Sequence, residues 1–223
     1  MDGWLNINKP VNMTSAVAVA IVKRRLKAKK VGHGGTLDPL AVGVLPICIG
    51  KATKETEKIM NFQKEYLFNI KFGETRTTDD RGGEIVEKNS IIPSESEILN
   101  TMPKFMGEIE QTPPIYSAIK VNGKRAYQLA RQGKKIELKA RKVVIYDLIF
   151  KGFVAEKEAQ FLVKCSKGFY VRKFGFDFAK KMGALGYISY LERRAVGIFN
   201  QSNIVELDDI KENMELIKLI DFL

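Results

Sequence analysis

Residues 32–46 read GHGGTLDPLAVGVLP, and this stretch places one acidic side chain between glycines and an apolar run. Gly34 and Gly35 permit close approach of another backbone segment because neither carries a Cβ atom. Pro39 restricts Asp38 to extended conformations, and the apolar residues that follow are typical of a core. The stretch therefore predicts a carboxylate held on a stiff loop beside the core. Taken alone, the same pattern also fits an Asx turn without a chemical role.

The composition of the chain favours a globular protein that binds a polyanion. Its 223 residues include 37 Lys and Arg against 26 Asp and Glu, a formal net charge of +11. A chain of this length can bury about 70 % of its unfolded surface, which is enough for an ordinary core. No stretch reaches the roughly 18 apolar residues of a membrane span, and the start lacks a signal-peptide pattern. We therefore expect a cytoplasmic protein without membrane contact.

Motifs for metals and nucleotide cofactors are missing from the sequence. The two cysteines lie far apart and His33 is the only histidine, so zinc would find too few of its preferred ligands. A phosphate-binding loop ending at Gly50-Lys51 would need glycine at position 45 and Ser or Thr at position 52, which hold Leu45 and Ala52. We expect no metal and no cofactor.

Positive charge gathers in two segments. Six of the eight residues 23–30 are basic, and residues 120–142 contain nine basic residues and one acidic residue. The first segment ends a helix predicted to begin after Thr14 or Ser15, where cations stabilise the carbonyl end of the helix dipole. The second contains glycines and tyrosine and is typical of an arm that contacts phosphates. RNA is the favoured partner, and a merely basic enzyme is the alternative.

Apolar periodicity predicts intermixed strands and helices. Alternating apolar residues predict strands over residues 66–72, 143–150 and 161–165. Helical spacing and cap residues predict helices over residues 94–102, 170–182 and 208–223. Elements mixed in this order favour an α+β domain with a mixed sheet over a strict βαβ alternation.

Several blocks match a known family in the same order along the chain. The first is HGGTLDPLAVGVLPICIGKATK from His33, close to the family signature GHTGTLDPLATGVLP. The others are Gly3 with Asn8-Lys9-Pro10, Lys64-Glu65-Tyr66, residues 111–133, residues 165–172 (CSKGFYVR) and residues 190–196 (YLERRAV). Together these blocks resemble the TruB family of pseudouridine synthases and span most of residues 3–197.

The resemblance implies a fold, a domain plan and a reaction. The fold is the α+β pseudouridine synthase fold, with a mixed, mostly antiparallel central sheet flanked by helices and loops. The plan is a catalytic domain over residues 1–207 with a basic RNA-facing insertion at about 110–142, then a short C-terminal helix over 208–223 and no RNA-binding PUA domain. The implied reaction isomerises the T-loop uridine of tRNA, position 55: the glycosidic bond breaks, the base turns, and C5 joins the sugar.

The resemblance also implies roles for individual residues. Asp38 is the catalytic carboxylate, Arg172 pairs with it, and Tyr66 stacks on the uracil. The residues implied to bind the substrate are His33, Tyr66, Tyr170, Leu191 and Lys9. The residues implied to bind the RNA backbone are Lys120, Lys124, Arg125, Arg131, Lys134, Lys135, Arg141 and Lys142. The partner is the T arm of tRNA, bound by a monomer.

Less specific roles are the alternatives for the same residues. Core packing would account for Tyr66, Tyr170 and Leu191, and phosphate binding would account for Arg172. At the level of function, the alternatives are an RNA-binding or tRNA-folding module with incidental or lost catalysis, and a guide-RNA-dependent pseudouridine synthase.

Overall fold

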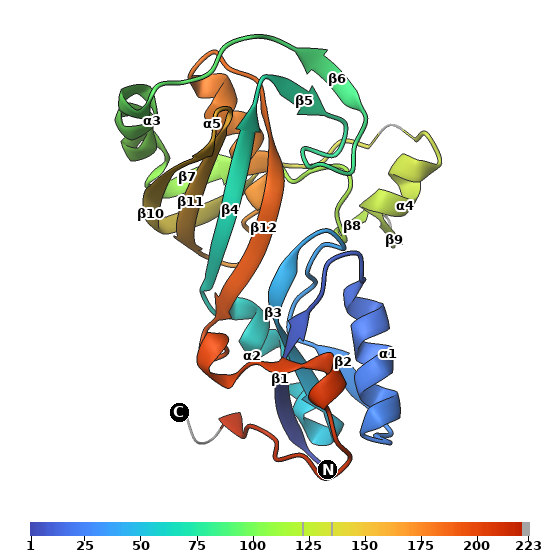
Figure 1. Cartoon of the computed structure of the whole chain (residues 1–223). Helices are drawn as coiled ribbons and strands as arrows, with labels where there is room; N and C mark the ends of the chain where they lie inside the picture. The colour runs from blue at the N-terminus through green and yellow to red at the C-terminus, as the bar shows by residue number, and fades with distance from the viewer. Residues whose placement is uncertain (122, 135, 220–223) are drawn as a thin grey trace. The chain divides into compact units, whose positions relative to one another are not determined.

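The computed structural model describes residues 1–121, 123–134 and 136–219. The chain forms two compact units: unit 1 comprises Met1–Tyr66 and Leu191–Leu223, and unit 2 comprises Leu67–Tyr190. Strands β4 (Lys64–Phe72) and β12 (Gly186–Val196) each pass from one unit into the other. Figure 1 shows the elements of both units, which are described separately below. In the described ranges, no helix has both the length and the apolar character needed to cross a membrane.

Unit 1 is a small mixed sheet with helices. Strand β3 lies antiparallel to β1 and β2 and parallel to the end of β12, while β13 adds to β1 in parallel. The elements are β1 (Gly3–Lys9), α1 (Ser15–Arg25), β2 (Val31–His33), β3 (Val42–Ile49), α2 (Thr56–Asn61) and β13 (Val205–Glu206), with 3-10 turns at Gly50–Lys54, Gln201–Asn203 and Leu207–Asp209.

Helix α1 begins and ends as its sequence predicts. Thr14 is the N-cap, and its hydroxyl accepts a hydrogen bond from the Val17 N–H at 3.2 Å. The last turn carries three basic residues, which complement the exposed carbonyl groups at that end. Helix α1 packs beside β2, so its first residue, Ser15, can reach the loop that follows β2.

The helix predicted over residues 208–223 is wrong for the residues that the structure describes there. After the turn Leu207–Asp209, the backbone is irregular up to Ile217, which forms an isolated antiparallel bridge with Trp4. The Trp4 N–H donates to the Ile217 carbonyl and the Ile217 N–H donates to the Trp4 carbonyl, both at 2.8 Å. Pairing with a strand edge therefore outweighs the helical spacing of the apolar residues, and residues 220–223 lie outside the described part.

Unit 2 is built on the strand order β12-β4-β11-β10-β7. Strand β10 lies antiparallel to both β11 and β7. The elements that lie wholly in unit 2 are β5 (Glu74–Arg76), β6 (Ile85–Lys88), α3 (Glu95–Thr101), β7 (Gly107–Gln111), β8 (Lys120–Val121), β9 (Lys124–Arg125), α4 (Ala126–Arg131), β10 (Arg141–Ala155), β11 (Glu158–Cys165) and α5 (Val171–Lys181), with a 3-10 turn at Met102–Phe105.

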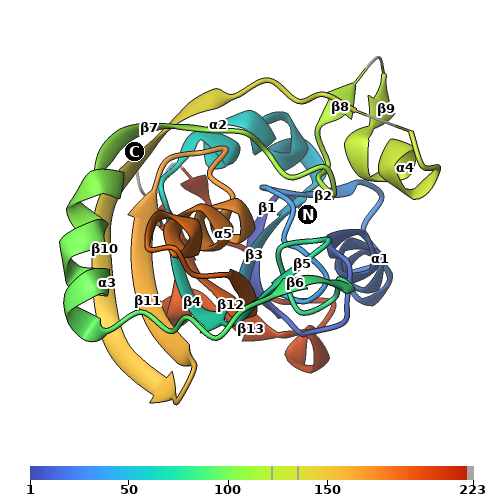
Figure 2. The same cartoon turned by 90° about the horizontal axis from the view of Figure 1, so that it is seen from above.

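The core of unit 2 is a phenylalanine cluster between α5 and the sheet. Figure 2 shows β10 and β11 curving around α5. Phe174 and Phe178 of α5 lie against Phe68 of β4 and Phe161 of β11, with ring centroids 5.3 to 5.7 Å apart. These close contacts between buried rings fix the orientation of α5 on the sheet. The predicted α+β class and mixed central sheet are confirmed, and the domain end at residue 207 stays a prediction.

Candidate active site

The loop that carries Asp38 joins β2 to β3 in unit 1. Gly34 begins the loop, and its N–H donates to the Pro46 carbonyl at 2.8 Å. A Cβ at Gly34 would lie 2.6 Å from the Ile59 side chain, so only glycine lets the loop pack this closely on the core. Asp38 is half-buried, four residues further along the loop. The predicted stiff loop beside the core is therefore present.

Every main-chain carbonyl from Gly35 to Pro39 accepts a hydrogen bond. The donors come from β1, α1, β12 and the loop itself. In chain order they are Arg193 Nη2 to Gly35 at 3.1 Å, Arg193 Nη1 to Thr36 at 3.3 Å, Ser15 Oγ to Leu37 at 3.0 Å, Ala41 N–H to Asp38 at 3.1 Å and Lys9 Nζ to Pro39 at 3.3 Å. With five consecutive carbonyls held, the backbone under Asp38 has one favoured arrangement.

Lys9, one of the predicted substrate-binding residues, is fully buried. Its ammonium donates to the carbonyls of Pro10 at 2.7 Å and Met13 at 2.8 Å, besides that of Pro39. Burial lowers the pKa of Lys9 from 10.5 to about 8, although the Asp38 carboxylate raises it. Its three donors are used inside the protein, so Lys9 supports the loop, and its role in binding the substrate stays a prediction.

The other site residues predicted in unit 1 lie around this loop or on the strands that pass into unit 2. His33 is half-buried at the end of β2, and its Nδ1 accepts a hydrogen bond from the Gly35 N–H at 3.3 Å. Tyr66 is half-buried on β4, and Leu191, on β12, is buried at 9 % exposure. The packing alternative for Leu191 thus agrees with its burial, and a buried wall can also line a pocket.

Arg172 lies in unit 2, in the first turn of α5, and is 4 % exposed. Its guanidinium donates to the Thr78 carbonyl at 3.0 Å and the Tyr116 carbonyl at 2.9 Å. Its Nε lies 3.7 Å from Asp80 Oδ2. The guanidinium is thereby fixed in orientation by three partners from two loops.

Two polar side chains of unit 2, Gln111 and Asp80, support this arginine, and neither is among the site residues predicted from the sequence. Gln111 is buried and makes two bonds with the main chain of Tyr170: its amide donates to the carbonyl at 3.0 Å and its Oε1 accepts from the N–H at 2.8 Å. This pair holds the N-cap residue of α5, two positions before Arg172. The sequence around Gln111 does not show which groups its side-chain amide binds, because the partner lies 59 residues further along the chain.

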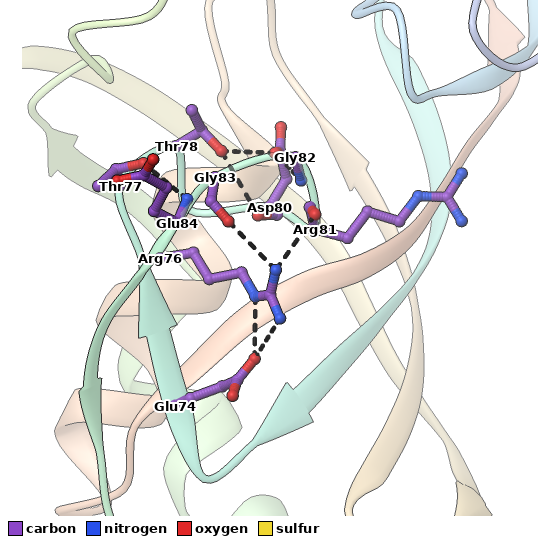
Figure 3. A network of polar contacts seen from close by, with 9 residues as sticks. All are labelled: Glu74, Arg76, Thr77, Thr78, Asp80, Arg81, Gly82, Gly83 and Glu84. Carbon is purple, nitrogen blue, oxygen red and sulfur yellow. Dashed lines mark hydrogen bonds and ion pairs between the residues drawn. The ribbon is translucent and has the colours of Figure 1, made fainter.

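The loop between β5 and β6 positions Asp80 (Figure 3). Asp80 Oδ1 accepts from the Thr78 hydroxyl at 2.6 Å and the Gly82 N–H at 2.9 Å, which leaves Oδ2 towards Arg172. Arg76 closes the loop by donating to the carbonyls of Arg81 at 3.3 Å and Gly83 at 3.1 Å, and Glu74 Oε1 holds its guanidinium at 2.6 and 2.9 Å. The adjacent Asp79 is half-buried, and its burial raises its pKa to about 6, although the nearby Lys173 and Arg172 lower it.

Comparisons with known proteins agree on one family. Residues 23–171 match the family described as TruB family pseudouridylate synthase (N terminal domain). The chain is 47 % identical over 212 residues to tRNA pseudouridine synthase B of Ehrlichia canis, which covers 95 % of this chain and 70 % of that protein. The chain belongs to the TruB family. The enzyme of the same name from Bradyrhizobium diazoefficiens is 44 % identical over 211 residues, 95 % of this chain and 61 % of that protein.

Solved structures show the same relationship for the fold. A chain in the structure titled "Crystal Structure of a Cbf5-Nop10-Gar1 Complex" has a TM-score of 0.73 and 28 % identity, covering 93 % of this chain and 53 % of that one. A chain in a structure of an H/ACA RNP bound to a substrate RNA containing 2'-deoxyuridine has a TM-score of 0.70 and 25 % identity, covering 93 % and 51 %. The TruB resemblance predicted from sequence is confirmed, together with the pseudouridine synthase fold.

The catalytic set predicted from the TruB motif is distributed over both units. Asp38 and Tyr66 lie in unit 1, and Arg172 lies in unit 2. The pairing of Arg172 with Asp38 and the stacking role of Tyr66 stay predictions. Within the described ranges, no group of three or more His, Cys, Asp or Glu side chains is arranged to hold a metal ion.

The predicted RNA-binding side chains of unit 2 lie on the surface. The exposed ones are Lys120, Lys124, Arg125, Lys134, Arg141 and Lys142. Lys142 pairs with Glu108 at 2.8 Å, with both side chains mostly in solvent, so this pair is worth little and can be exchanged for a phosphate. Lys135 and the side chain of Arg131 lie outside the described part.

Proposed function

We propose that this protein is a tRNA pseudouridine synthase that isomerises the uridine at position 55 in the T loop. The N1 glycosidic bond is broken, the detached uracil turns, and C5 is joined to C1′, so no atom is gained or lost. The observation that carries this proposal is the Asp38 loop, whose carbonyls are all held and whose sequence matches the TruB signature. Curated relatives 41–47 % identical to this chain are named tRNA pseudouridine synthase B.

In this proposal Asp38 is the catalytic carboxylate. Covalent catalysis by an aspartate divides a difficult displacement into two easier steps. Arg172 pairs with the carboxylate and orients it, and Tyr66 stacks on the uracil; base stacking on an aromatic ring is worth about 1–3 kcal/mol. Asp80 and Gln111 act on Arg172, because they fix its guanidinium and the start of α5.

The substrate uridine must leave its stacked position before it can react. Extrusion costs a few kcal/mol, which contacts from His33, Tyr66, Tyr170 and Leu191 offset. The exposed basic residues of 120–142 bind the T-arm backbone, so shape and phosphate contacts provide the selectivity. The protein acts as a monomer in the cytoplasm, where its substrate is found.

The guide-RNA-dependent alternative is less well supported. The chain is 28 % identical to the Cbf5 complex chain but 47 % identical to the Ehrlichia canis tRNA enzyme. Loss of catalysis is also disfavoured, because Asp38, Tyr66 and Arg172 are all present and the loop under Asp38 is fully held.

Purified protein incubated with an unmodified tRNA transcript tests the proposal. We expect one T-loop uridine to become pseudouridine without added guide RNA, as read by chemical mapping of the transcript. A transcript with that uridine replaced by cytidine is the control. Conversion only in the presence of a guide RNA, or binding without conversion, would contradict the proposal.

We expect that neutralising exposed basic residues of the segment 120–142, the basic arm, weakens the electrostatic contribution to RNA binding. We expect Lys134→Gln, Lys139→Gln and Arg141→Gln together to reduce the slope of log Kd against log salt by roughly 2 to 3, since each lost phosphate contact removes about 0.7–0.9. The measurement is tRNA binding over a series of salt concentrations. The matched control removes three exposed lysines outside residues 120–142, namely Lys88, Lys104 and Lys157. Equal slopes for the two triple variants would exclude the arm from the interface.

A further inference from the structure

We propose that Arg193 and Ser15 are positioning residues that set the direction of the Asp38 carboxylate by holding the backbone of residues 35–37. This inference rests on the proposed catalytic role of Asp38. Neither residue is among the site residues predicted from the sequence: Arg193 lies in the YLERRAV block, and Ser15 is one of the two predicted N-cap candidates of α1.

Arg193 is fixed at both its main chain and its side chain. Its backbone pairs with Gly43 in the parallel ladder between β12 and β3. Its Nε donates to the Val44 carbonyl at 2.8 Å, so the start of β3 holds the guanidinium in place. The two remaining nitrogens donate to the carbonyls of Gly35 and Thr36. Arg193 thus links the sheet to the loop backbone at Gly35 and Thr36, shortly before Asp38.

Ser15 holds the next residue from the other side. Its hydroxyl donates to the Leu37 carbonyl at 3.0 Å and accepts from the Leu37 N–H at 2.9 Å. The side chain is buried, so water does not compete for either bond. Because Leu37 immediately precedes Asp38, these bonds fix the main chain from which the carboxylate projects.

The chemistry of Arg193 argues against a role in stability alone. The side chain is 2 % exposed, and all its hydrogen bonds go to carbonyl groups. In the portion of the chain that the structure describes, it makes no ion pair with a carboxylate. Burying a cation carries a large cost in lost hydration, and an apolar side chain of similar volume usually stabilises a core at least as well. What the guanidinium adds is geometry, because its planar donors fix several carbonyls at once.

The loop needs such fixing because its sequence is permissive. Gly35 adopts a φ of +123°, a conformation open to glycine, and glycine loses the most conformational freedom on folding. A misplacement of about 1 Å at a reacting group can cost about 10²-fold in rate. Small backbone shifts at residues 35–37 would therefore lower the rate of the chemical step without changing the surface that binds RNA.

Single-turnover rates and tRNA affinities of Arg193→Lys and Ser15→Ala test the inference. We expect Arg193→Lys to lower the rate about 30- to 100-fold and Ser15→Ala about 10-fold, with Kd for tRNA within threefold of wild type. Val22→Ala is the control: Val22 is fully buried in α1 and contributes to stability. It should leave the rate within twofold. Should Arg193→Lys fail to fold, Ser15→Ala, the smaller change, still decides the outcome.

Hydrogen exchange gives a readout that is independent of catalysis. The amides of residues 35–38 should exchange at least tenfold faster in Arg193→Lys and in Ser15→Ala than in Val22→Ala. The comparison requires that the free energy of unfolding of Val22→Ala is equal to or lower than that of the two test variants. Wild-type rates in folded variants, or an exchange increase spread equally over unit 1, would overturn the inference while leaving the proposed function intact. An inactive wild-type enzyme with the expected exchange pattern would instead overturn the proposed function and leave the loop-holding role supported.

Discussion

We expect Asp38→Asn to abolish pseudouridine formation while tRNA affinity stays within a few-fold of wild type. The amide has nearly the shape of the carboxylate, so the held loop accommodates it without repacking. It is not a nucleophile and carries no charge to stabilise a developing cation on the ribose, so the chemical step loses its main support. We expect single-turnover conversion to fall by at least about 10³-fold, as measured by chemical mapping of a tRNA transcript.

The matched control for this variant is Asp209→Asn. Asp209 is exposed in unit 1, and its substitution removes the same charge from the same unit. It should keep the wild-type rate and affinity. If Asp38→Asn kept substantial activity, the assignment of the catalytic carboxylate would be wrong. If it lost affinity in parallel with activity, Asp38 would be a binding residue and the chemistry would lie elsewhere.

The strands and caps were predictable because they depend on residues near one another in sequence. Phe68, Ile70 and Phe72 alternate along β4, and all are buried as the period of two predicts. Ser94 and Glu97 form the predicted capping box at the start of α3. The Asp38 loop was also predictable, since its glycines permit close packing of the backbone and Pro39 restricts the conformation of Asp38.

The supports of the site were not predictable because they depend on partners far away in the chain. Arg193 and Arg194 are adjacent in sequence, yet Arg193 lies 2 % exposed among carbonyls and Arg194 is only partly buried. Nothing local distinguishes them. Likewise, the sequence does not show that the Lys9 ammonium donates to three main-chain carbonyls. For the C-terminal tail, the edge of β1 decides the conformation.

Gly43 illustrates the same dependence and gives the largest expected effect on stability. It lies in β3, five residues after Asp38, with a φ of +99°. A Cβ added there would lie 2.4 Å from the Arg193 carbonyl oxygen and 3.2 Å from the carbonyl carbon. The obstacle is backbone in a paired strand, and the Arg193 side chain is itself held by three bonds, so neither can move aside cheaply.

We therefore expect Gly43→Ala to lower the free energy of unfolding by about 4 kcal/mol or more, or to prevent folding, because clash and backbone strain add. Gly183→Ala separates the two causes. Gly183 also has a positive φ, +73°, but a Cβ there meets nothing within 4 Å, so only the strain of about 1–2 kcal/mol applies. Urea unfolding of both variants, with soluble yield where Gly43→Ala does not fold, measures the difference. Equal losses of stability would mean that the close approach of β3 to β12 is not the reason for glycine at position 43. This result would also contradict the role of β3 in holding Arg193 in place.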